Sequence, residues 1–413
     1  MFYPRYLTQN LLEAAKDTPA VLLTGARQTG KSTLMQDLFE GTKGTREYIT
    51  LDDLTVLAAA TRSPADFVAN LPKQVLLDEV QRAPGIFLPI KQNIDQDRVP
   101  GRFLMTGSAH VLAFQEIADA LAGRMEIHTL WPLSQVEIRD TKANFIDWMF
   151  SDKPSSHLKP VEHKELCHLM INGGYPESLA RANQKRRDEW FKGYLNTLLE
   201  RDVRELSNIE GLQVMPSLLS LIAGRIGGLL NNSDLGRSLS LPTTSLRRYL
   251  ALLNAAYLTV LLPAWAVNVG KRVVKSPKIF LNDTGLLCHL LGVDESRLAS
   301  SEGPIGPVLE NFVALELTKQ LGWSRTDASL FHFRTVTGQE VDFVLEARDG
   351  SIVGLEVKAA RSITEKAFSG LNALKESTKR RFRRGVVIYR GDKAVNFGND
   401  FLAVPVSGLW NEK

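Results

Sequence analysis

A glycine-rich loop near the start of this 413-residue chain carries the most specific chemistry: Gly25-Ala-Arg-Gln-Thr-Gly30-Lys31-Ser32. It follows the apolar run AVLLT and precedes the helical stretch STLMQDLF. Glycines at this spacing let backbone N–H groups surround phosphate oxygens, while Lys31 would reach the β- and γ-phosphates and the Ser32 hydroxyl would bind Mg²⁺. The residues expected to contact a nucleotide are Gly25, Ala26, Arg27, Gln28, Thr29, Gly30, Lys31, Ser32 and Thr33.

Two acidic residues, Asp78 and Glu79, follow the apolar run VLL. At the end of a neighbouring strand, Asp78 would hold Mg²⁺ through water and Glu79 would polarise the attacking water as general base. A further apolar run, RFLM, ends in the polar residues TGS, and Ser108 is a candidate for contact with the γ-phosphate or the lytic water. The alternative for that segment is an ordinary strand-ending turn.

A second group of ionisable residues lies near the C-terminus: Asp342, Glu356 and Lys358, preceded by Glu310 in an amphipathic stretch. Alternate residues of a strand point to opposite faces. We therefore expect two sets of apolar residues to define the buried faces: Val341, Phe343 and Leu345, and Val353, Leu355 and Val357. Asp342, Glu356 and Lys358 would then face away from them and converge.

Three segments must position these residues. From residue 20 to about 139, the runs AVLLTG, REYITL, QVLLDE, GRFLMTG and RMEIHTL alternate with helical stretches, which predicts a wound α/β domain with a parallel sheet. Helices dominate from residue 163 to about 254, and strands return from residue 330. We expect an α/β protein with domains at 1–150, 151–295 and 296–413.

The middle of the chain is basic, with 15 Lys and Arg against 7 Asp and Glu in residues 181–280. Residues 231–262 read as helix, turn and helix, and a hairpin follows, which is the order of a winged-helix module. Its second helix would present Ser245, Arg247 and Arg248 to a DNA groove. Lys271, Arg272 and Lys275 on the hairpin would meet phosphates. Protein docking is the alternative, because many such modules serve only as interfaces.

Composition excludes several classes of protein. Hydrophobic residues make up 44% and charged residues 23%, as in ordinary folded proteins rather than disordered or rod-like ones. The longest apolar run, 255–267, contains Thr259 and Pro263 and is shorter than the ~20 residues of a membrane helix. The start of the chain lacks the pattern of a secretory signal, and only Cys167 and Cys288 are present, so we expect a cytoplasmic protein.

These motifs together resemble those of the AAA-type ATPase family that carries a C-terminal domain of formerly unknown function. The resemblance implies ATP rather than GTP, with Mg²⁺, and an arginine that reaches the γ-phosphate from a neighbouring subunit in a homo-oligomer. Arg124 and Arg201 are the candidates. The motifs that carry the resemblance are PRYL near the N-terminus, the phosphate loop, LLDEVQ, LMTGSAH, LAGR ending at Arg124, WPLS from Trp131, GGYP from Gly173, and the helix with Arg201-Asp202.

The C-terminal order, Asp342 followed by Glu-x-Lys on the next strand after a helix with Glu310, resembles the PD-(D/E)xK nuclease fold. That resemblance implies Mg²⁺ held by Asp342 and Glu356, with Glu310 completing the site and Lys358 helping to orient or deprotonate water. No proline precedes Asp342, which departs from the pattern. A solvated strand face with an ion pair, or an inactive relic of the fold, is the alternative.

Two functions are consistent with these observations. The first is a Mg²⁺-dependent ATPase that couples nucleotide turnover to DNA binding or processing. The set of Asp342, Glu356 and Lys358 favours this function. The second is a regulatory ATPase whose C-terminal domains bind a protein partner and cut nothing. The balance of 17 basic and 17 acidic residues in 281–413 favours the second. A basic run, KRRFRR at 379–384, is either a solvated helix end or a phosphate contact.

Overall fold

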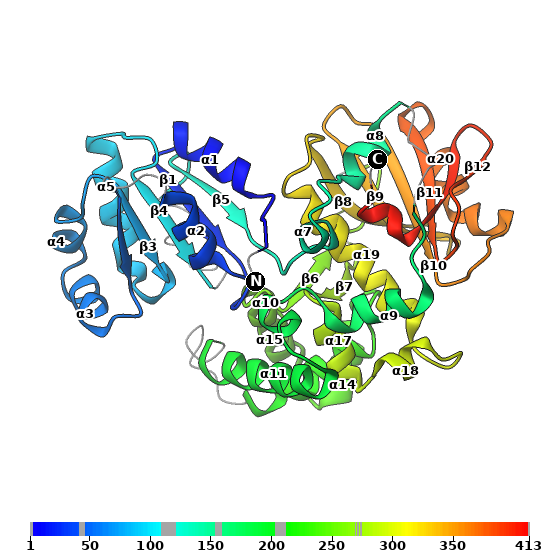
Figure 1. Cartoon of the computed structure of the whole chain (residues 1–413), viewed down its shortest axis with the longest axis horizontal. Helices are drawn as coiled ribbons and strands as arrows, with labels where there is room; N and C mark the ends of the chain where they lie inside the picture. The colour runs from blue at the N-terminus through cyan, green and yellow to red at the C-terminus, as the bar shows by residue number, and fades with distance from the viewer. Residues whose placement is uncertain are drawn as a thin grey trace.

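A computed structural model of the chain describes residues 3–40, 46–108, 121–152, 159–202, 212–268, 270, 272 and 275–411. Two β-sheets lie at opposite ends of the molecule, and a group of helices lies below and between them (Figure 1). Within the described residues, no helix combines the length and apolar character needed to cross a membrane.

The N-terminal sheet is parallel, with strand order β2-β3-β4-β1-β5. All five apolar runs predicted as strands form it, so that prediction is confirmed. Alternate strand residues enter two separate apolar clusters, one against α1 and α2 and the other against α3, α4 and α5. The elements are α1 (Thr8–Asp17), β1 (Ala20–Thr24), α2 (Lys31–Glu40), β2 (Glu47–Thr50), α3 (Leu54–Arg62), α4 (Pro64–Ala69), β3 (Val75–Asp78), α5 (Phe87–Gln96), β4 (Phe103–Gly107) and β5 (Met125–Thr129).

Helices form the middle of the chain and surround one antiparallel hairpin, β6–β7. The order α14, α15, β6, β7 matches the predicted helix, turn, helix, hairpin. The connection between the two strands packs on the C-terminal sheet, where Ala264 bridges His332. The elements are α7 (Gln135–Arg139), α8 (Phe145–Phe150), α9 (His163–Asn172), α10 (Pro176–Leu179), α11 (Gln184–Thr197), α13 (Met215–Ala223), α14 (Asn232–Leu239), α15 (Thr243–Ala255), β6 (Thr259–Leu262), β7 (Lys278–Leu281), α17 (Thr284–Leu291) and α18 (Glu295–Ala299).

The C-terminal sheet is mixed, with order β12-β13-β11-β10-β9-β8. Helix α19 packs on one face and α20 on the other, which places the two helices in different apolar clusters. The short strands β12 and β13 at one edge were not predicted. The elements are α19 (Ile305–Leu321), β8 (Ala328–Arg334), β9 (Glu340–Ala347), β10 (Ile352–Lys358), α20 (Ser369–Thr378), β11 (Phe382–Tyr389), β12 (Val395–Phe397) and β13 (Phe401–Pro405).

A register shift in β9 corrects the simple alternation expected there. Phe331 pairs with Val344 and Phe333 pairs with Val341, so β9 has one residue more than β8 over this stretch. Val341 joins the cluster on the α20 side, whereas Phe343 joins the cluster on the α19 side. The expectation that Val341 and Phe343 share a face is therefore wrong, because the extra residue near Asp342 breaks the period of two.

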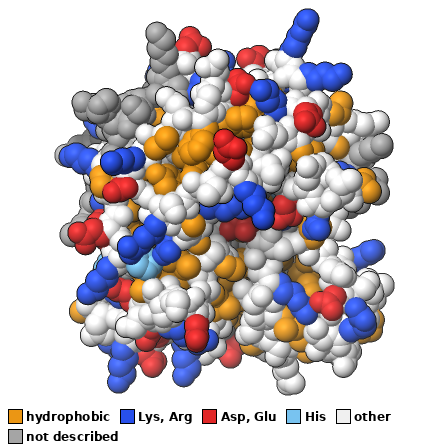
Figure 2. All heavy atoms as spheres, turned by 90° about the vertical axis from the view of Figure 1, so that its right-hand side faces the viewer, with side chains coloured by type: hydrophobic (Ala, Val, Ile, Leu, Met, Phe, Trp, Pro, Cys, Tyr) orange, Lys and Arg blue, Asp and Glu red, His pale blue; other side chains and the backbone are white. Residues whose placement is uncertain are grey.

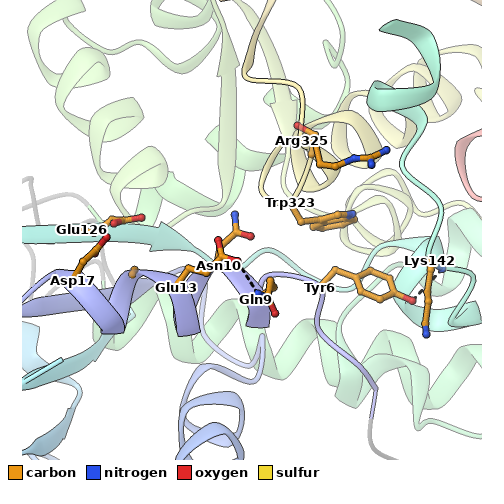
Figure 3. A pocket seen from close by; sticks show the side chains of 11 residues that line it. Tyr6, Gln9, Asn10, Glu13, Asp17, Glu126, Lys142, Trp323 and Arg325 are labelled. Atoms are coloured by element: carbon orange, nitrogen blue, oxygen red, sulfur yellow. Dashed lines mark hydrogen bonds between the residues drawn. The ribbon is translucent and has the colours of Figure 1, made fainter. Parts of the chain in front are cut away.

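Helix α1, which packs on the N-terminal sheet, faces the end of α19 across a cavity of about 720 Å³ (Figure 3). Asn10 donates a hydrogen bond to the carbonyl of Gly322 at 3.0 Å, and the rings of Tyr6 and Trp323 lie 5.8 Å apart. The cavity walls carry Glu13 and other charged side chains. The contact between these two parts of the molecule thus combines a hydrogen bond, an aromatic contact and charged side chains.

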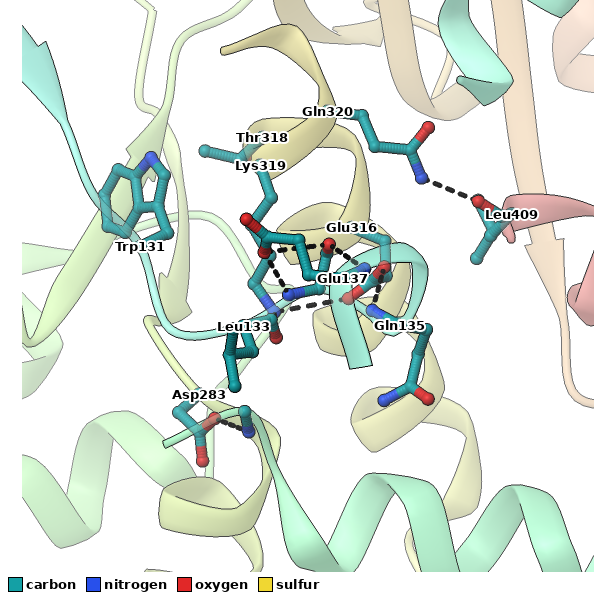
Figure 4. Close-up of polar contacts among 12 residues, drawn as sticks. Trp131, Leu133, Gln135, Glu137, Asp283, Glu316, Thr318, Lys319, Gln320 and Leu409 are labelled. Atoms are coloured by element: carbon teal, nitrogen blue, oxygen red, sulfur yellow. Dashed lines mark hydrogen bonds and ion pairs between the residues drawn. The ribbon is translucent and has the colours of Figure 1, made fainter. Parts of the chain in front are cut away.

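A buried ion pair connects the segment after β5 to helix α19 (Figure 4). Glu316 accepts the backbone N–H of Gln135 at 3.0 Å and pairs with Lys319 at 3.2 Å. Lys319 also donates to the carbonyl of Leu133 at 3.0 Å. Burial raises the pKa of Glu316, and the Lys319 ammonium opposes that rise. The ammonium, together with the backbone N–H of Gln135, thus favours the charged form of a fully buried carboxyl group.

We predict that Lys319→Met lowers stability by about 3–5 kcal/mol, because it leaves the Glu316 carboxylate buried without a cation. Denaturant unfolding monitored by circular dichroism measures the change. The double variant Glu316→Gln/Lys319→Met removes both charges and should be more stable than Lys319→Met alone. A double variant as unstable as the single one would show that packing, rather than charge, causes the loss.

Candidate functional site

The phosphate loop connects β1 to α2, as the sequence predicts. Gly25 has φ 144° and Gly30 has φ 91°, backbone conformations that favour glycine. A Cβ on Gly25 would lie 2.2 Å from the carbonyl oxygen of Leu130, so only glycine fits there. Lys31 begins α2 and donates to the carbonyls of Gly25 at 3.1 Å and Ala26 at 2.9 Å. The ammonium group therefore lies inside the loop that would surround the phosphates.

Asp78 lies at the carboxyl end of β3 and receives hydrogen bonds from three hydroxyl groups. Ser32 donates to Oδ1 at 2.9 Å and Tyr48 donates to Oδ2 at 2.7 Å. Thr106, at the end of β4 between β3 and β1, also donates to Oδ1. A hydroxyl and a carboxylate side by side are oxygen ligands that Mg²⁺ prefers, so Ser32 and Asp78 fit the predicted metal role.

Tyr48 was not anticipated from the sequence, although it lies in the predicted strand β2. Partial burial and the hydrogen bond to Asp78 raise its pKa to about 12. The phenol therefore stays protonated at neutral pH and remains a donor to the carboxylate. Its effect is to orient Asp78.

Glu79 occupies a left-handed backbone position, with φ 57°. Ser108 donates to its Oε1 at 2.8 Å, and the amide of Gln81 donates to its Oε2. The backbone N–H of Glu79 donates to Thr106 Oγ1 at 3.3 Å. Ser108, a predicted candidate for contact with the γ-phosphate, thus holds the carboxylate of the candidate base. Gln81 belongs to the LLDEVQ motif, but its role is visible only in the structure.

Arg5 is a part of the site that sequence reasoning missed. Its guanidinium donates to the carbonyl of Thr29 in the phosphate loop at 2.9 Å, and to the carbonyl of Trp131 at 2.6 Å. It also pairs with Glu137 at 2.9 Å, and only 8% of the arginine side chain is exposed. Arg5 lies in the PRYL segment, and nothing in that segment alone indicates a partner in the loop.

Arg124 and Arg201 are the two candidates for an arginine that reaches the γ-phosphate of a neighbouring subunit. Arg124 pairs with Asp95 at 2.5 Å and donates to the carbonyl of Ala122 at 3.1 Å. Its partners therefore lie within the N-terminal sheet domain. The side chain of Arg201 lies outside the described residues.

The predicted C-terminal set is brought together, but around a lysine that was not predicted. Nζ of Lys278, from β7, lies 2.9 Å from Oε1 of Glu310 and 2.9 Å from Oδ1 of Asp342. Lys358 pairs with Glu356 at 2.6 Å. Burial, and the neighbouring Asp342 carboxylate, raise the pKa of Glu310 to about 7 and that of Glu356 to about 7.

The hairpin differs from the predicted phosphate-binding wing. Arg272 pairs with Glu346 at 2.5 Å and stacks over the ring of Phe331, 5.0 Å from its centroid. Its guanidinium is therefore engaged by the C-terminal sheet in this structure, and its contact with DNA stays a prediction. Lys271 lies outside the described residues. Lys275 is exposed and donates to the carbonyl of Arg334 at 3.2 Å.

Helix α15 presents the predicted arginines on its outer face. Arg247 and Arg248 are exposed, and no ion pair to either is found among the described residues. Leu246, Tyr249 and Leu253 on the same helix are buried. The helix therefore has one buried face and one basic face.

A parallel sheet, a phosphate loop that carries Lys31 and Ser32, and an acidic pair at the end of β3 define a P-loop nucleoside triphosphatase. A family model described as an AAA domain matches residues 17–139. Models described as domains of unknown function, DUF8612 and DUF4143, match residues 163–297 and 305–409.

Two relatives match 80% or more of the chain. The uncharacterized protein Rv2008c of Mycobacterium tuberculosis is 31% identical over 97% of this chain and 82% of its own length. The uncharacterized protein MJ1544 of Methanocaldococcus jannaschii is 24% identical over 80% of this chain and 73% of its own. The chain belongs to the family of the mycobacterial protein, and its N-terminal part is an AAA-type P-loop ATPase domain.

Two solved structures are similar at a lower level. The Walker-type ATPase PABY2304 of Pyrococcus abyssi has a TM-score of 0.42 and 16% identity, covering 69% of this chain and 94% of its own. The Holliday junction branch migration motor RuvB of Thermotoga maritima has a TM-score of 0.30 and 17% identity, covering 61% of this chain and 86% of its own.

We predict that Glu79→Gln slows ATP hydrolysis by roughly 100-fold or more while ATP still binds, because the amide cannot accept a proton from water. Single-turnover hydrolysis and binding of a fluorescent ATP analogue separate the two effects. Glu47→Gln, an exposed carboxylate on β2, is the control and should leave hydrolysis unchanged. Normal turnover in Glu79→Gln would exclude it as the base.

We also predict that Arg5→Lys weakens ATP binding by roughly 10-fold, because one ammonium cannot keep all three contacts and a lost hydrogen bond to a charged group costs about 1.5 kcal/mol. Titration with the same fluorescent analogue measures it. Arg62→Lys, at an exposed position on α3, serves as the control. If Arg5→Lys lowered only the melting temperature, Arg5 would be structural and would not position the loop.

Proposed function

We propose that this protein is a Mg²⁺-dependent ATPase that couples ATP binding and hydrolysis to the binding of DNA by its middle segment. The observation that carries the DNA part is the outer face of α15, where Arg247 and Arg248 are both exposed. Adjacent arginines on the second helix of a helix, turn, helix, hairpin unit are suited to phosphate and base-edge contacts.

Contacts between the phosphate loop and the middle segment support the coupling. The hydroxyl of Tyr257 donates to Thr24 Oγ1 at 2.7 Å, and Thr24 is the last residue of β1 before the loop. The hydroxyl of Tyr194 donates to the carbonyl of Arg27 at 3.5 Å. Tyr257 follows α15 by two residues. A change in loop conformation on nucleotide binding would therefore reach the basic helix directly.

Residues of one chain would fill most of the hydrolytic roles. Loop N–H groups and Lys31 would bind the phosphates, and Ser32 with Asp78 would hold Mg²⁺, which when bound neutralises phosphate charge. Glu79, oriented by Ser108 and Gln81, would accept a proton from the attacking water. Arg124 or Arg201 from a second copy would complete the site in a homo-oligomer.

The rival proposal is a regulatory ATPase that binds a protein partner and cleaves nothing. Contacts of the C-terminal domain favour the absence of cleavage. Of the basic run at 379–384, Arg381 pairs with Glu346, and Arg383 with Asp152 at 2.8 Å. Arg384 donates to the carbonyl of Ser151 at 2.6 Å. These arginines serve internal contacts, and Figure 2 shows acidic and basic side chains mixed over this side of the molecule.

The two cysteines support a proposal for the cellular location. Cys167 and Cys288 are buried and not disulfide-bonded, and burial raises the pKa of both thiols. Thiols kept in this form are in keeping with a reducing compartment, and we propose the cytoplasm.

We predict that Arg247→Glu/Arg248→Glu weakens DNA binding by at least about 10-fold and reduces its dependence on salt, because phosphate contacts release counterions. Fluorescence anisotropy with labelled duplex DNA at several salt concentrations measures both, and basal ATPase activity should be unchanged.

A matched control for this variant is Lys185→Glu/Arg186→Glu. It changes the net charge equally on the exposed side of α11, in the same basic segment. Equal losses in the two double variants would indicate nonspecific attraction. Unchanged DNA affinity in the α15 variant would indicate instead that α15 docks a protein.

A further inference from the structure

Lys278 lies at the centre of the C-terminal carboxylate group but comes from the hairpin. Its Nζ is 2.9 Å from Glu310 Oε1 and 2.9 Å from Asp342 Oδ1, and 5% of its side chain is exposed. The other oxygen of Asp342 accepts the backbone N–H of Val357 at 2.9 Å. Both oxygens of Asp342 thus have partners within the chain.

A divalent cation and this ammonium group would need the same place. Mg²⁺ binds carboxylate oxygens at about 2.0–2.1 Å, so an ion that bridged Glu310 and Asp342 would coincide with Nζ. Two cations close together in a buried site repel strongly, because little water screens them. Within the described part of the chain, no group of three or more His, Cys, Asp and Glu side chains is arranged to hold a metal ion. With Lys278 in place, the donor set does not fit the predicted metal.

Glu356 gives no substitute site. Its Oε1 pairs with Lys358 at 2.6 Å. Its Oε2 is buried and has no hydrogen-bond partner among the described residues, and one such oxygen is not a ligand set for Mg²⁺. The three carboxylates are therefore faced by two ammonium groups that belong to the chain itself.

The backbone of Lys278 is fixed on both sides. In β7 it pairs with Leu262 of β6, and it forms a bridge with Leu229. The side chain extends from this fixed point to α19 and β9, which carry Glu310 and Asp342. Lys278 thus joins the hairpin to the C-terminal domain through two charged contacts.

We propose that Lys278 is the resident cation of this centre, where its ammonium group takes the place of a divalent metal ion, and that the centre joins the hairpin to the C-terminal domain instead of cleaving nucleic acid. This proposal concerns a site separate from the ATP site and does not depend on ATP hydrolysis.

Mn²⁺ is a suitable probe, because it is a paramagnetic hard cation with the oxygen preference of Mg²⁺. The nucleotide-free full-length chain is titrated with Mn²⁺, and free Mn²⁺ is measured by electron paramagnetic resonance. The variants are Lys278→Met, which removes the charge, Lys278→Arg, which keeps it, Asp342→Asn, and Lys278→Met/Asp342→Asn.

Lys278→Met should bind about one Mn²⁺ per chain more than the wild type, because its carboxylates are left without their cation. Lys278→Arg should behave as the wild type, and the added Asp342→Asn should remove the gained site. The same Mn²⁺ should raise the melting temperature of Lys278→Met and leave that of the wild type unchanged.

Three results would overturn the proposal. The first is a Mn²⁺ ion bound by the wild type and lost in Asp342→Asn. The second is cleavage of DNA in Mn²⁺ that Asp342→Asn abolishes. The third is a folded Lys278→Met, shown by circular dichroism, that gains no Mn²⁺. Where Lys278→Met does not fold, the comparison of the wild type with Asp342→Asn decides alone: equal Mn²⁺ binding supports the proposal, and a site lost in Asp342→Asn overturns it.

Discussion

Three buried carboxylates, each paired with a cation, lie where the parts of this protein meet. Glu137 pairs with Arg5 at 2.9 Å, Glu316 with Lys319 at 3.2 Å, and Asp342 with Lys278 at 2.9 Å. The Glu137 and Asp342 pairs connect segments far apart in the chain. The Glu316 pair lies within α19, and Glu316 accepts a hydrogen bond from the backbone N–H of Gln135. An unpaired buried charge costs far more than an unmade surface ion pair, so these contacts fix how the parts fit together more than they add stability.

The phosphate loop also has an environment built from distant segments. Arg5 reaches the loop from the N-terminal segment, Tyr257 approaches its start from the end of α15, and Tyr194 contacts Arg27 from α11. Ala26 of the loop belongs to the large apolar cluster that also contains the middle helices and α19. The loop is thus one of the places where the ATPase domain meets the rest of the molecule.

The sequence predicted features whose signal is local. The loop Gly25–Ser32, the acidic pair at Asp78 and the five parallel strands all follow from short motifs and from apolar runs bounded by turns. The helix, turn, helix, hairpin order and the strands carrying Asp342 and Glu356 were found by the same means. The edge strand β12 has only three residues, too few for a period to be visible.

Features that depend on contacts between distant segments could not be predicted in the same way. The partner of Glu310 and Asp342 is Lys278, which in the sequence is one more lysine in a basic stretch. Arg272 lies in a basic stretch of the sequence, which suggested an exposed side chain. In the structure, the connection after β6 brings it to Glu346. The extra residue in β9 near Asp342 likewise depends on pairing with β8, and the alternation of apolar and polar residues in the sequence does not reveal it.

The division of the core indicates where motion driven by a nucleotide would occur. The middle helices, α19 and one face of the C-terminal sheet share one apolar cluster, whereas the two clusters of the ATPase sheet are separate from it. Parts that share a tightly packed core move together, and parts that meet through polar contacts can shift at smaller cost. We infer that the middle and C-terminal parts act as one body, which the ATPase sheet displaces through the loop, Tyr257 and Arg5. The exposed face of α15 would then report the state of the nucleotide without any rearrangement inside the C-terminal domain.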